Sequence, residues 1–163
     1  MSNVPASDPL PAGAVLADDA IELRLIHVLH PGDARPAEKE FLSAVREYHF
    51  AIYCREDGRT TGSIRLRATN DPRIVRAVGH VGYDVNTEHR GKGYATRAIR
   101  LIASLARLCG VMPLWLLIEP NNDASRRAAE RAGFTFVDIV ETMPEARGLR
   151  QEVGPHLRRY VLT

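Results

Sequence analysis

Alternating apolar and polar residues predict that the first half of the chain forms strands. Residues 21–30, IELRLIHVLH, alternate in this way, which is typical of a strand with one buried face. Asp57 and Gly58 give a hairpin turn signal at the end of a second such segment. Because short turns separate the segments, we expect an antiparallel sheet. The further predicted strands are 48–57, 60–68 and 77–85.

Helical spacing takes over in the second half of the chain. Between residues 95 and 109 the polar side chains recur every three or four positions, so they share one face of a helix that Gly110 ends. The run LWLLI at 114–118 is uniformly apolar, as in a central strand covered on both faces. A strand–helix–strand crossover makes its two strands parallel. We therefore expect 80–85 and 114–118 to form a central parallel pair.

The remaining segments complete a single α+β domain. A short helix is predicted within 34–47, and another begins after Asn122 and ends at Gly133. We expect one domain over 21–163, with a mixed, largely antiparallel sheet of about six or seven strands and about three or four helices. Residues 1–20 hold three prolines and three aspartates and are predicted to be a flexible tail. The last two predicted strands are 134–141 and 152–163.

Composition and charge argue against several classes of protein. The net charge of +2 on 163 residues is too small to indicate a nucleic-acid or membrane-surface partner. No apolar run approaches the roughly 20 residues that span a bilayer, and no basic residue precedes Arg24 as a signal peptide requires. Cys54 and Cys109 lack metal-ligand spacing and are expected to be reduced. The prediction is a cytoplasmic protein without a metal site.

Two glycines at the start of a predicted helix indicate an anion site. In HRGKGYATRAIR, residues 89–100, Gly91 and Gly93 flank Lys92. A helix start leaves N–H groups unpaired and carries about half a positive charge. Glycine lets an anion approach this backbone, and Arg90 and Lys92 add charge beside it. The segment therefore predicts a phosphate or pyrophosphate cradle, although the two glycines could also serve only to shape a turn.

Two well-known phosphate loops fit this segment poorly. A P-loop requires G-x-x-x-x-G-K-[ST], which the chain lacks. A dinucleotide-binding loop requires G-x-G-x-x-G directly after a strand, whereas Thr96 stands at the third glycine and residues 86–90 separate the strand from Gly91. Glu119, at the end of the next predicted strand, could still contact a ribose. A dinucleotide-binding oxidoreductase is therefore kept as a weaker alternative.

The run RGKGYA resembles the Q/R-x-x-G-x-G/A signature of the GNAT acetyltransferases, with Arg90, Gly93 and Ala95 in place. Further on, EPNNDASRRAAERAGF resembles the N-x-x-S-x-x-x-x-E-x-x-G-F pattern of the same family. The resemblance covers about residues 77–136 and is nearest to the RimJ/RimL-like branch. Two linked motifs at a matching separation are more specific than either motif alone. The second motif is carried by Asn122, Ser125, Glu130, Gly133 and Phe134.

The resemblance implies acetyl-CoA as co-substrate. Its diphosphate would lie on the backbone N–H groups of 90–96, and its pantetheine arm would enter between strands 80–85 and 114–118. The backbone of Val85 would pair with that arm. Asn122 would serve both as helix cap and as cofactor contact, although capping alone accounts for it. The implied cofactor residues are Val85, Arg90, Gly91, Lys92, Gly93, Tyr94, Ala95, Thr96 and Asn122.

Acetyl transfer to an amine requires a neutral amine, and therefore a base. His80 is the first candidate, because many family members carry a glutamate on this strand and the ordinary histidine pKa of about 6.5 suits the task. The alternative is a histidine that is hydrogen-bonded on a sheet face. Asp84 lies on the same face of an alternating strand and is a second candidate, and Glu141 is a third.

The usual proton donor to the leaving thiolate is missing, because Ala129 stands where many family members place a tyrosine. The RimJ/RimL-like branch has a serine earlier in this helix, and Ser125 matches it. Ser125 could equally be a first-turn hydrogen-bonding residue. Tyr83 and Tyr160 are further candidates, with packing as the alternative role for each.

The predicted function is transfer of an acetyl group from acetyl-CoA to a primary amine, either a peptide N-terminus or a small molecule. The family usually places two helices where 31–47 leaves room for one, so the acceptor pocket should be more open. The loop 143–154, or a second copy of the chain in a homodimer, could close it. Arg126 and Arg127 either reach a nucleotide phosphate or face solvent. The main alternative is a non-catalytic sensor that binds acyl-CoA.

Overall fold

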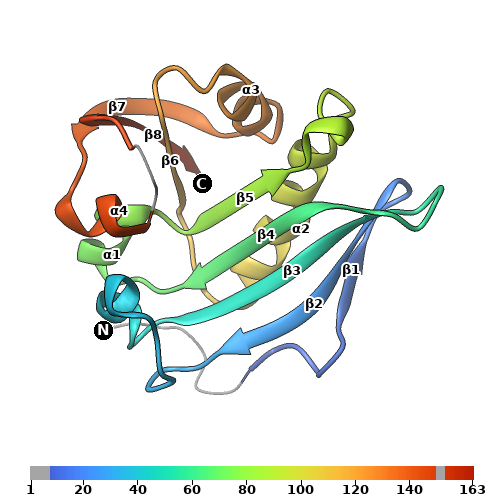
Figure 1. The fold of residues 1–163 in the computed structure, drawn as a ribbon, viewed down its shortest axis with the longest axis horizontal. Helices are drawn as coiled ribbons and strands as arrows, with labels where there is room; N and C mark the ends of the chain where they lie inside the picture. The colour runs from blue at the N-terminus through green and yellow to red at the C-terminus, as the bar shows by residue number, and fades with distance from the viewer. Residues whose placement is uncertain (1–7, 150–152) are drawn as a thin grey trace.

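The structure is a computed structural model that describes residues 8–149 and 153–163. Eight strands form two antiparallel sheets, ordered β1-β2-β3-β4-β5 and β6-β8-β7 (Figure 1). The first sheet contains β1 (Val15–Ala17), β2 (Ile21–Leu29), β3 (Arg46–Cys54), β4 (Thr60–Ala68) and β5 (Val81–Val85). The second contains β6 (Leu114–Ile118), β7 (Thr135–Glu141) and β8 (His156–Leu162). The helices are α1 (Pro72–Val78), α2 (Tyr94–Leu108), α3 (Asp123–Arg131) and α4 (Pro144–Leu149), with short 3-10 turns η1 (Ala37–Leu42) and η2 (Thr87–His89).

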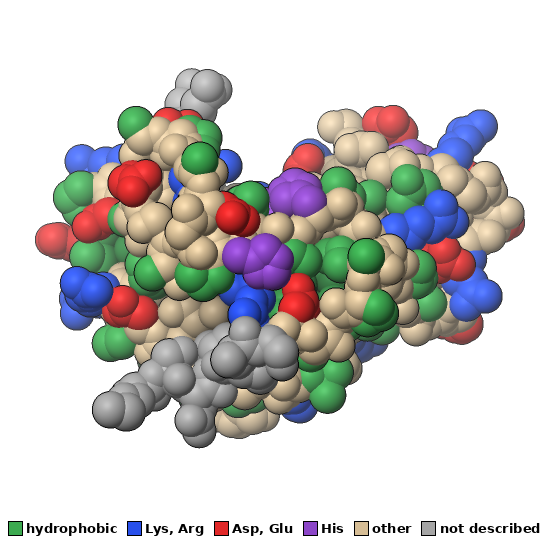
Figure 2. Space-filling view, turned by 90° about the horizontal axis from the view of Figure 1, so that it is seen from below, with side chains coloured by type: hydrophobic (Ala, Val, Ile, Leu, Met, Phe, Trp, Pro, Cys, Tyr) green, Lys and Arg blue, Asp and Glu red, His purple; other side chains and the backbone are tan. Residues whose placement is uncertain are grey.

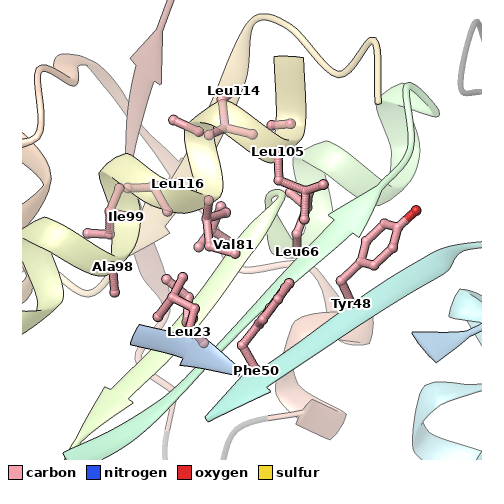
Figure 3. Close-up of a cluster of buried hydrophobic side chains, with 14 of the residues drawn as sticks. Leu23, Tyr48, Phe50, Leu66, Val81, Ala98, Ile99, Leu105, Leu114 and Leu116 are labelled. Atoms are coloured by element: carbon pink, nitrogen blue, oxygen red, sulfur yellow. The ribbon is translucent and has the colours of Figure 1, made fainter. Parts of the chain in front are cut away.

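Helix α2 lies against one face of the five-stranded sheet and forms the core with it. Figure 3 shows Ile99 and Leu105 of α2 facing Leu23, Phe50 and Leu66 of the strands, and all five are buried. Full burial of one such side chain contributes about 1.5–3 kcal/mol. The apolar face of α2 therefore fixes this helix on the sheet, and with it the position of the glycine loop at its N-terminus.

The predicted single α+β domain is confirmed, and so are most of its elements. Strands β2, β4 and β6 and helix α2 agree with the sequence patterns to within a residue or two. The predicted helix over 34–47 is wrong in extent, because it is only the turn η1 and β3 already starts at Arg46. Residues 15–17 form β1, so the prediction of a flexible tail is wrong for this part of 1–20. Residues 1–7 lie outside the described part of the chain.

Helix α1 replaces the first part of the strand predicted over 77–85. Asp71 caps this helix by accepting a hydrogen bond from the Arg73 N–H at 2.9 Å, and Pro72 occupies its first position. Both residues are helix-start signals that are equally typical of turns. Strand β5 is consequently short and begins only at Val81.

Strands β5 and β6 do not form the expected parallel ladder, because they belong to different sheets. They meet at their beginnings, where the His80 N–H donates to the Trp115 carbonyl at 2.9 Å. From there the two strands separate (Figure 1). Among the described residues, no helix is both long and apolar enough to cross a membrane.

Candidate active site

A cavity of about 300 Å³ lies where β5 ends and α2 and α3 begin. Each element contributes a different kind of group: β5 contributes a tyrosine hydroxyl, the loop before α2 contributes bare backbone, and α3 contributes arginines and a serine. The walls are formed by Tyr83, Asp84, Val85, His89, Arg90, Gly91, Gly93, Tyr94, Ala95, Thr96, Asn122, Ala124, Ser125, Arg127, Ala128 and Arg131.

The glycine loop has the local geometry of an anion cradle. Gly91 and Gly93 adopt left-handed backbone conformations, with φ of 77° and 80°. Gly93 is the N-cap of α2, so the N–H groups of the first turn, 94–96, have no intrahelical partner. This turn holds no acidic residue, and a Cβ added at either glycine would find nothing within 4 Å. The open space and unpaired donors fit a diphosphate group.

Most of the cofactor residues predicted from the sequence gather in this one cavity. Lys92 is the exception among the nine, because it is exposed and does not line the wall. Asn122 caps α3 by accepting a hydrogen bond from the Ser125 N–H at 3.1 Å. Arg90 folds back, and its Nε donates to the Val85 carbonyl at 2.9 Å. A pantetheine arm that paired with this carbonyl would have to displace the Arg90 side chain, which is largely exposed.

Two hydroxyl groups meet across the cavity. The Tyr83 hydroxyl donates to the Ser125 carbonyl at 3.2 Å and lies 2.5 Å from the Ser125 Oγ. Tyr83 comes from β5 and Ser125 from α3, so the pair links the two walls. Tyr160, by contrast, is fully buried, and its hydroxyl lies near Glu130 and Arg126 outside the cavity lining. Of the three hydroxyl groups considered as proton donors, those of Tyr83 and Ser125 therefore lie together at the cavity, whereas that of Tyr160 is packed in the core.

Comparison with known proteins identifies the family. Residues 9–135 match the family model described as Acetyltransferase (GNAT) domain. The chain belongs to the GNAT acetyltransferase family. It is 34% identical over 125 residues to YjcK of Bacillus subtilis, a protein named as an N-acetyltransferase, and the match covers 70% of this chain and 62% of YjcK.

Solved structures share the GNAT fold at low sequence identity. A Vibrio cholerae protein named as a ribosomal-protein-serine acetyltransferase superposes with a TM-score of 0.63 at 14% identity, covering 94% of this chain and 99% of that one. The microcin C7 self-immunity acetyltransferase MccE, in complex with acetyl-CoA and AMP, superposes with a TM-score of 0.54 at 20% identity, covering 71% and 60%. Both the expected family and the expected fold are therefore confirmed.

His80 does not have the surroundings of a base in this GNAT domain. It is 2% exposed, and both ring nitrogens are hydrogen-bonded: Nδ1 accepts from the Trp115 N–H at 2.9 Å, and Nε2 donates to the Thr69 carbonyl at 2.9 Å. Burial, together with the charge of Arg67, lowers the pKa of His80 to about 4 although the Thr69 bond opposes this. This geometry argues against the proton-accepting role expected for His80 and favours the alternative of a hydrogen-bonded histidine between the sheets.

The other two candidate bases lie in exposed positions. Asp84 stands at the rim of the cavity, where its carboxylate is largely exposed and lies 3.7 Å from the Arg90 guanidinium. Glu141 ends β7, is exposed and does not line the cavity. Of the three bases considered from the sequence, Asp84 alone reaches the cavity wall.

Three basic side chains belong to the wall, and two of them, His89 and Arg131, had no assigned role in the sequence. His89 precedes the glycine loop, and Arg127 and Arg131 stand one helical turn apart on α3. The i, i+4 spacing of the two arginines is the signal that places them on one face. Arg126 points elsewhere, because its guanidinium binds Asp123 at 3.0 Å and the Pro120 carbonyl at 3.2 Å. Of the two arginines considered together in the sequence, Arg127 is the one that lines the cavity.

Proposed function

We propose that this GNAT domain transfers an acetyl group from acetyl-CoA to a primary amine. The observation that carries the proposal is the glycine loop, which opens the N-terminus of α2 onto a cavity with Arg127 and Arg131 on its opposite wall. Bare N–H donors on one side and guanidinium groups on the other suit a ligand with several phosphate groups. Acetyl-CoA is such a ligand, and MccE, which shares the fold, was solved with it.

The reaction joins the amine nitrogen to the acetyl carbon and breaks the carbon–sulfur bond. The amine has to lose a proton, and the leaving thiolate gains one. Backbone N–H groups at the end of β5 are suited to stabilise the developing oxyanion. The Tyr83–Ser125 hydroxyl pair is the proton donor in this proposal, because it lies in the wall between β5 and α3. Holding the two reactants together supplies much of the remaining acceleration.

Binding and turnover test the proposal directly. Calorimetric titration should show binding of both CoA and acetyl-CoA, and release of free CoA thiol should require an amine from a panel of amino acids, peptides and polyamines. Absence of CoA binding would contradict the proposal. Binding of CoA without turnover of any amine would instead support the alternative of an acyl-CoA sensor. The acyl-CoA sensor is favoured by Ala129 of α3, because an alanine at this position cannot supply the hydroxyl group that would protonate the leaving thiolate.

Loss of the hydroxyl pair is expected to slow catalysis without weakening CoA binding. Ser125→Ala and Tyr83→Phe should each lower kcat about 10- to 100-fold at pH 7. The loss should shrink above pH 8.5, because a thiol with an ordinary pKa of about 8.5 can then leave unprotonated. Thiol release between pH 6.5 and 9.5 measures this. Ser104→Ala, an exposed serine of α2, is the matched control. A kcat within twofold of wild type in both variants would exclude the pair as proton donor.

The two arginines of α3 are expected to contribute to CoA affinity. Arg127→Gln and Arg131→Gln should each weaken CoA binding about fivefold, and the loss should diminish at high salt, because both side chains are exposed. Arg126→Gln is the control on the same helix, since its guanidinium points away from the cavity. Calorimetry at low and at high ionic strength measures the effect. Equal losses in all three variants would argue against a specific role for Arg127 and Arg131.

A further inference from the structure

The face of the five-stranded sheet that points away from α2 carries a row of polar side chains. The strand register places His27, His49, Arg65 and Gly82 opposite one another on β2, β3, β4 and β5. Because side chains alternate along a strand, this row faces away from the buried row that contains Phe50. Figure 2 shows histidine side chains beside acidic and basic ones near the middle of the molecule as seen from below.

Arg65 lies directly over Gly82. A Cβ added at Gly82 would lie 2.8 Å from the Arg65 Cζ and Nη2, so the guanidinium rests against the strand at the position where a side chain is missing. Arg65 is half-buried. Within residues 8–149 and 153–163, its side chain takes part in no ion pair or hydrogen bond. A half-buried guanidinium without a partner is unusual, because burying a charge is costly unless it is paired.

The other charges on this face are already paired. Glu47 binds Arg35 at 3.1 Å and His49 at 3.2 Å, and its carboxylate is almost fully buried. Burial by itself raises the pKa of Glu47, but the His49 hydrogen bond and the charges of Arg67 and Arg35 outweigh it, so the pKa lies below its ordinary value. Glu47 therefore stays ionised and remains committed to its partners, which leaves Arg65 uncompensated.

The neighbouring carboxylates form no ion pair with Arg65 within the described residues, and Asp84, on the same face, lies 3.7 Å from the Arg90 guanidinium instead. Glu22 on β2 binds the Arg24 guanidinium at 3.0 Å. His27 stacks on His49 with ring centroids 4.4 Å apart, and burial and that neighbour lower the pKa of His27. His27 is thus neutral at neutral pH and adds no charge of its own. The face presents a net positive group at Arg65 that is suited to an anion.

Arg65 is also close to the proposed site of acetyl transfer. Gly82, beneath its guanidinium, directly precedes Tyr83, which lines the cavity. Asp84 lies on the same face of β5 as Gly82, because it is two residues further on, and it lines the cavity as well. Arg65 itself does not line the cavity, but it lies on the side of β5 to which the Asp84 side chain points. An acceptor that contacts Arg65 would have its amine near the end of β5.

We propose that Arg65 binds the carboxylate of the acceptor, so that the acceptor is a small primary amine of the amino-acid type and not a polyamine. This inference rests on the proposed function. A guanidinium can hold a carboxylate through two parallel hydrogen bonds, which fixes its orientation. The same positive charge repels an ammonium group, and it therefore favours the neutral amine that the reaction needs.

Matched acceptors test the inference. Each common amino acid is offered alongside its carboxamide, and lysine is also compared with cadaverine, which lacks the carboxylate. The wild-type domain should show a higher kcat/KM for the acids. Arg65→Gln should lower kcat/KM for the acids about 10- to 100-fold and leave the amides within about twofold. Arg65→Glu should reverse the preference toward cadaverine. Arg24→Gln, an arginine of the same face that is paired with Glu22, is the control.

The outcomes separate this inference from the proposed function. CoA binding, amine turnover and selective loss on the acids support both. Two outcomes would overturn the inference alone while CoA binding and turnover persist. The first is an equal kcat/KM for amides and acids in the wild-type domain, and the second is an equal loss of kcat/KM on both in Arg65→Gln. Absence of CoA binding, or of turnover with every amine, overturns the proposed function and the inference together. Thermal unfolding and CoA titration of each variant check that the fold and the cofactor site are intact.

Discussion

Gly93→Asp is expected to weaken CoA binding at least about 100-fold while the domain remains folded. Gly93 is the N-cap of α2, at the point where the unpaired N–H groups face the cavity. An aspartate there places a negative charge and a side chain where the diphosphate would lie. A charge about 4 Å from a second charge of the same sign costs about 4 kcal/mol when water is partly excluded, which corresponds to more than 100-fold in affinity.

Two further variants separate charge from backbone strain. Any residue other than glycine at Gly93 has to adopt its φ of 80°, which costs about 1–2 kcal/mol. Gly93→Ala carries this cost without the charge, and a Cβ there meets nothing within 4 Å. Gly58→Asp is the control, because it introduces the same charge and the same backbone strain in a hairpin turn away from the cavity. Gly58 has a φ of 69°, and a Cβ added there also meets nothing within 4 Å. Calorimetry with CoA and thermal unfolding measure the two effects. Undiminished CoA binding by folded Gly93→Asp would refute the cradle.

His80→Leu is expected to lower the free energy of unfolding by about 3 kcal/mol at neutral pH. The substitution leaves the buried Thr69 carbonyl and the Trp115 N–H without their partners, and each such group costs about 1–3 kcal/mol. These two bonds join the β4–α1 connection to β6, where the two sheets meet. His80→Asn retains an acceptor for the Trp115 N–H and should lose less. His156→Leu, at an exposed histidine, should have little effect.

The contribution of His80 should also depend on pH. The pKa is about 4 in the folded protein, below the ordinary value of 6.5. The unfolded chain binds a proton as the pH falls below 6.5, whereas the folded protein resists it until about pH 4. The stability that His80 contributes is therefore complete above pH 6.5 and is lost as the pH falls toward 4, by about 3 kcal/mol.

Urea denaturation of wild type and His80→Leu at several pH values measures this difference. Acidic groups common to both proteins cancel in the comparison. The gap in the free energy of unfolding should narrow steadily between pH 6.5 and 4. A gap that stays constant over this range would show that the His80 ring is not held in its neutral form.

The glycine loop shows what a sequence reveals about a site. Gly91 and Gly93 at a helix start imply a backbone that an anion can approach, because both the φ preference and the unpaired N–H groups are local properties of the chain. The same logic does not give the direction of a side chain. Lys92 was expected at the anion with its neighbours, yet it is exposed and outside the cavity wall. Arg126 and Arg127 were given two open roles together, and only Arg127 lines the cavity.

His80 shows why the roles of the candidate catalytic residues are harder to predict. Its partners, Thr69 and Trp115, are 11 and 35 residues away in the chain, so nothing local indicates that both ring nitrogens are occupied. The same holds for Tyr83 and Ser125, which meet across 42 residues. A residue type and a strand position made His80 a plausible base. Its burial and its two hydrogen bonds favour a structural role.

The sequence by itself determined the strands with alternating residues, the apolar run of β6, helix α2 and the glycine cradle at its start. These follow from periodicity and from backbone preferences, which act over a few neighbouring residues. Tertiary structure decided that β5 and β6 separate, that Asp71 and Pro72 begin a helix and not a turn, and that Arg65 lies over Gly82 with no ion pair among the described residues. The separation of the strands, the packing of α1 against Leu42 and Val45 and the position of Arg65 depend on contacts between segments distant in the chain, where packing and pairing outweigh local preference.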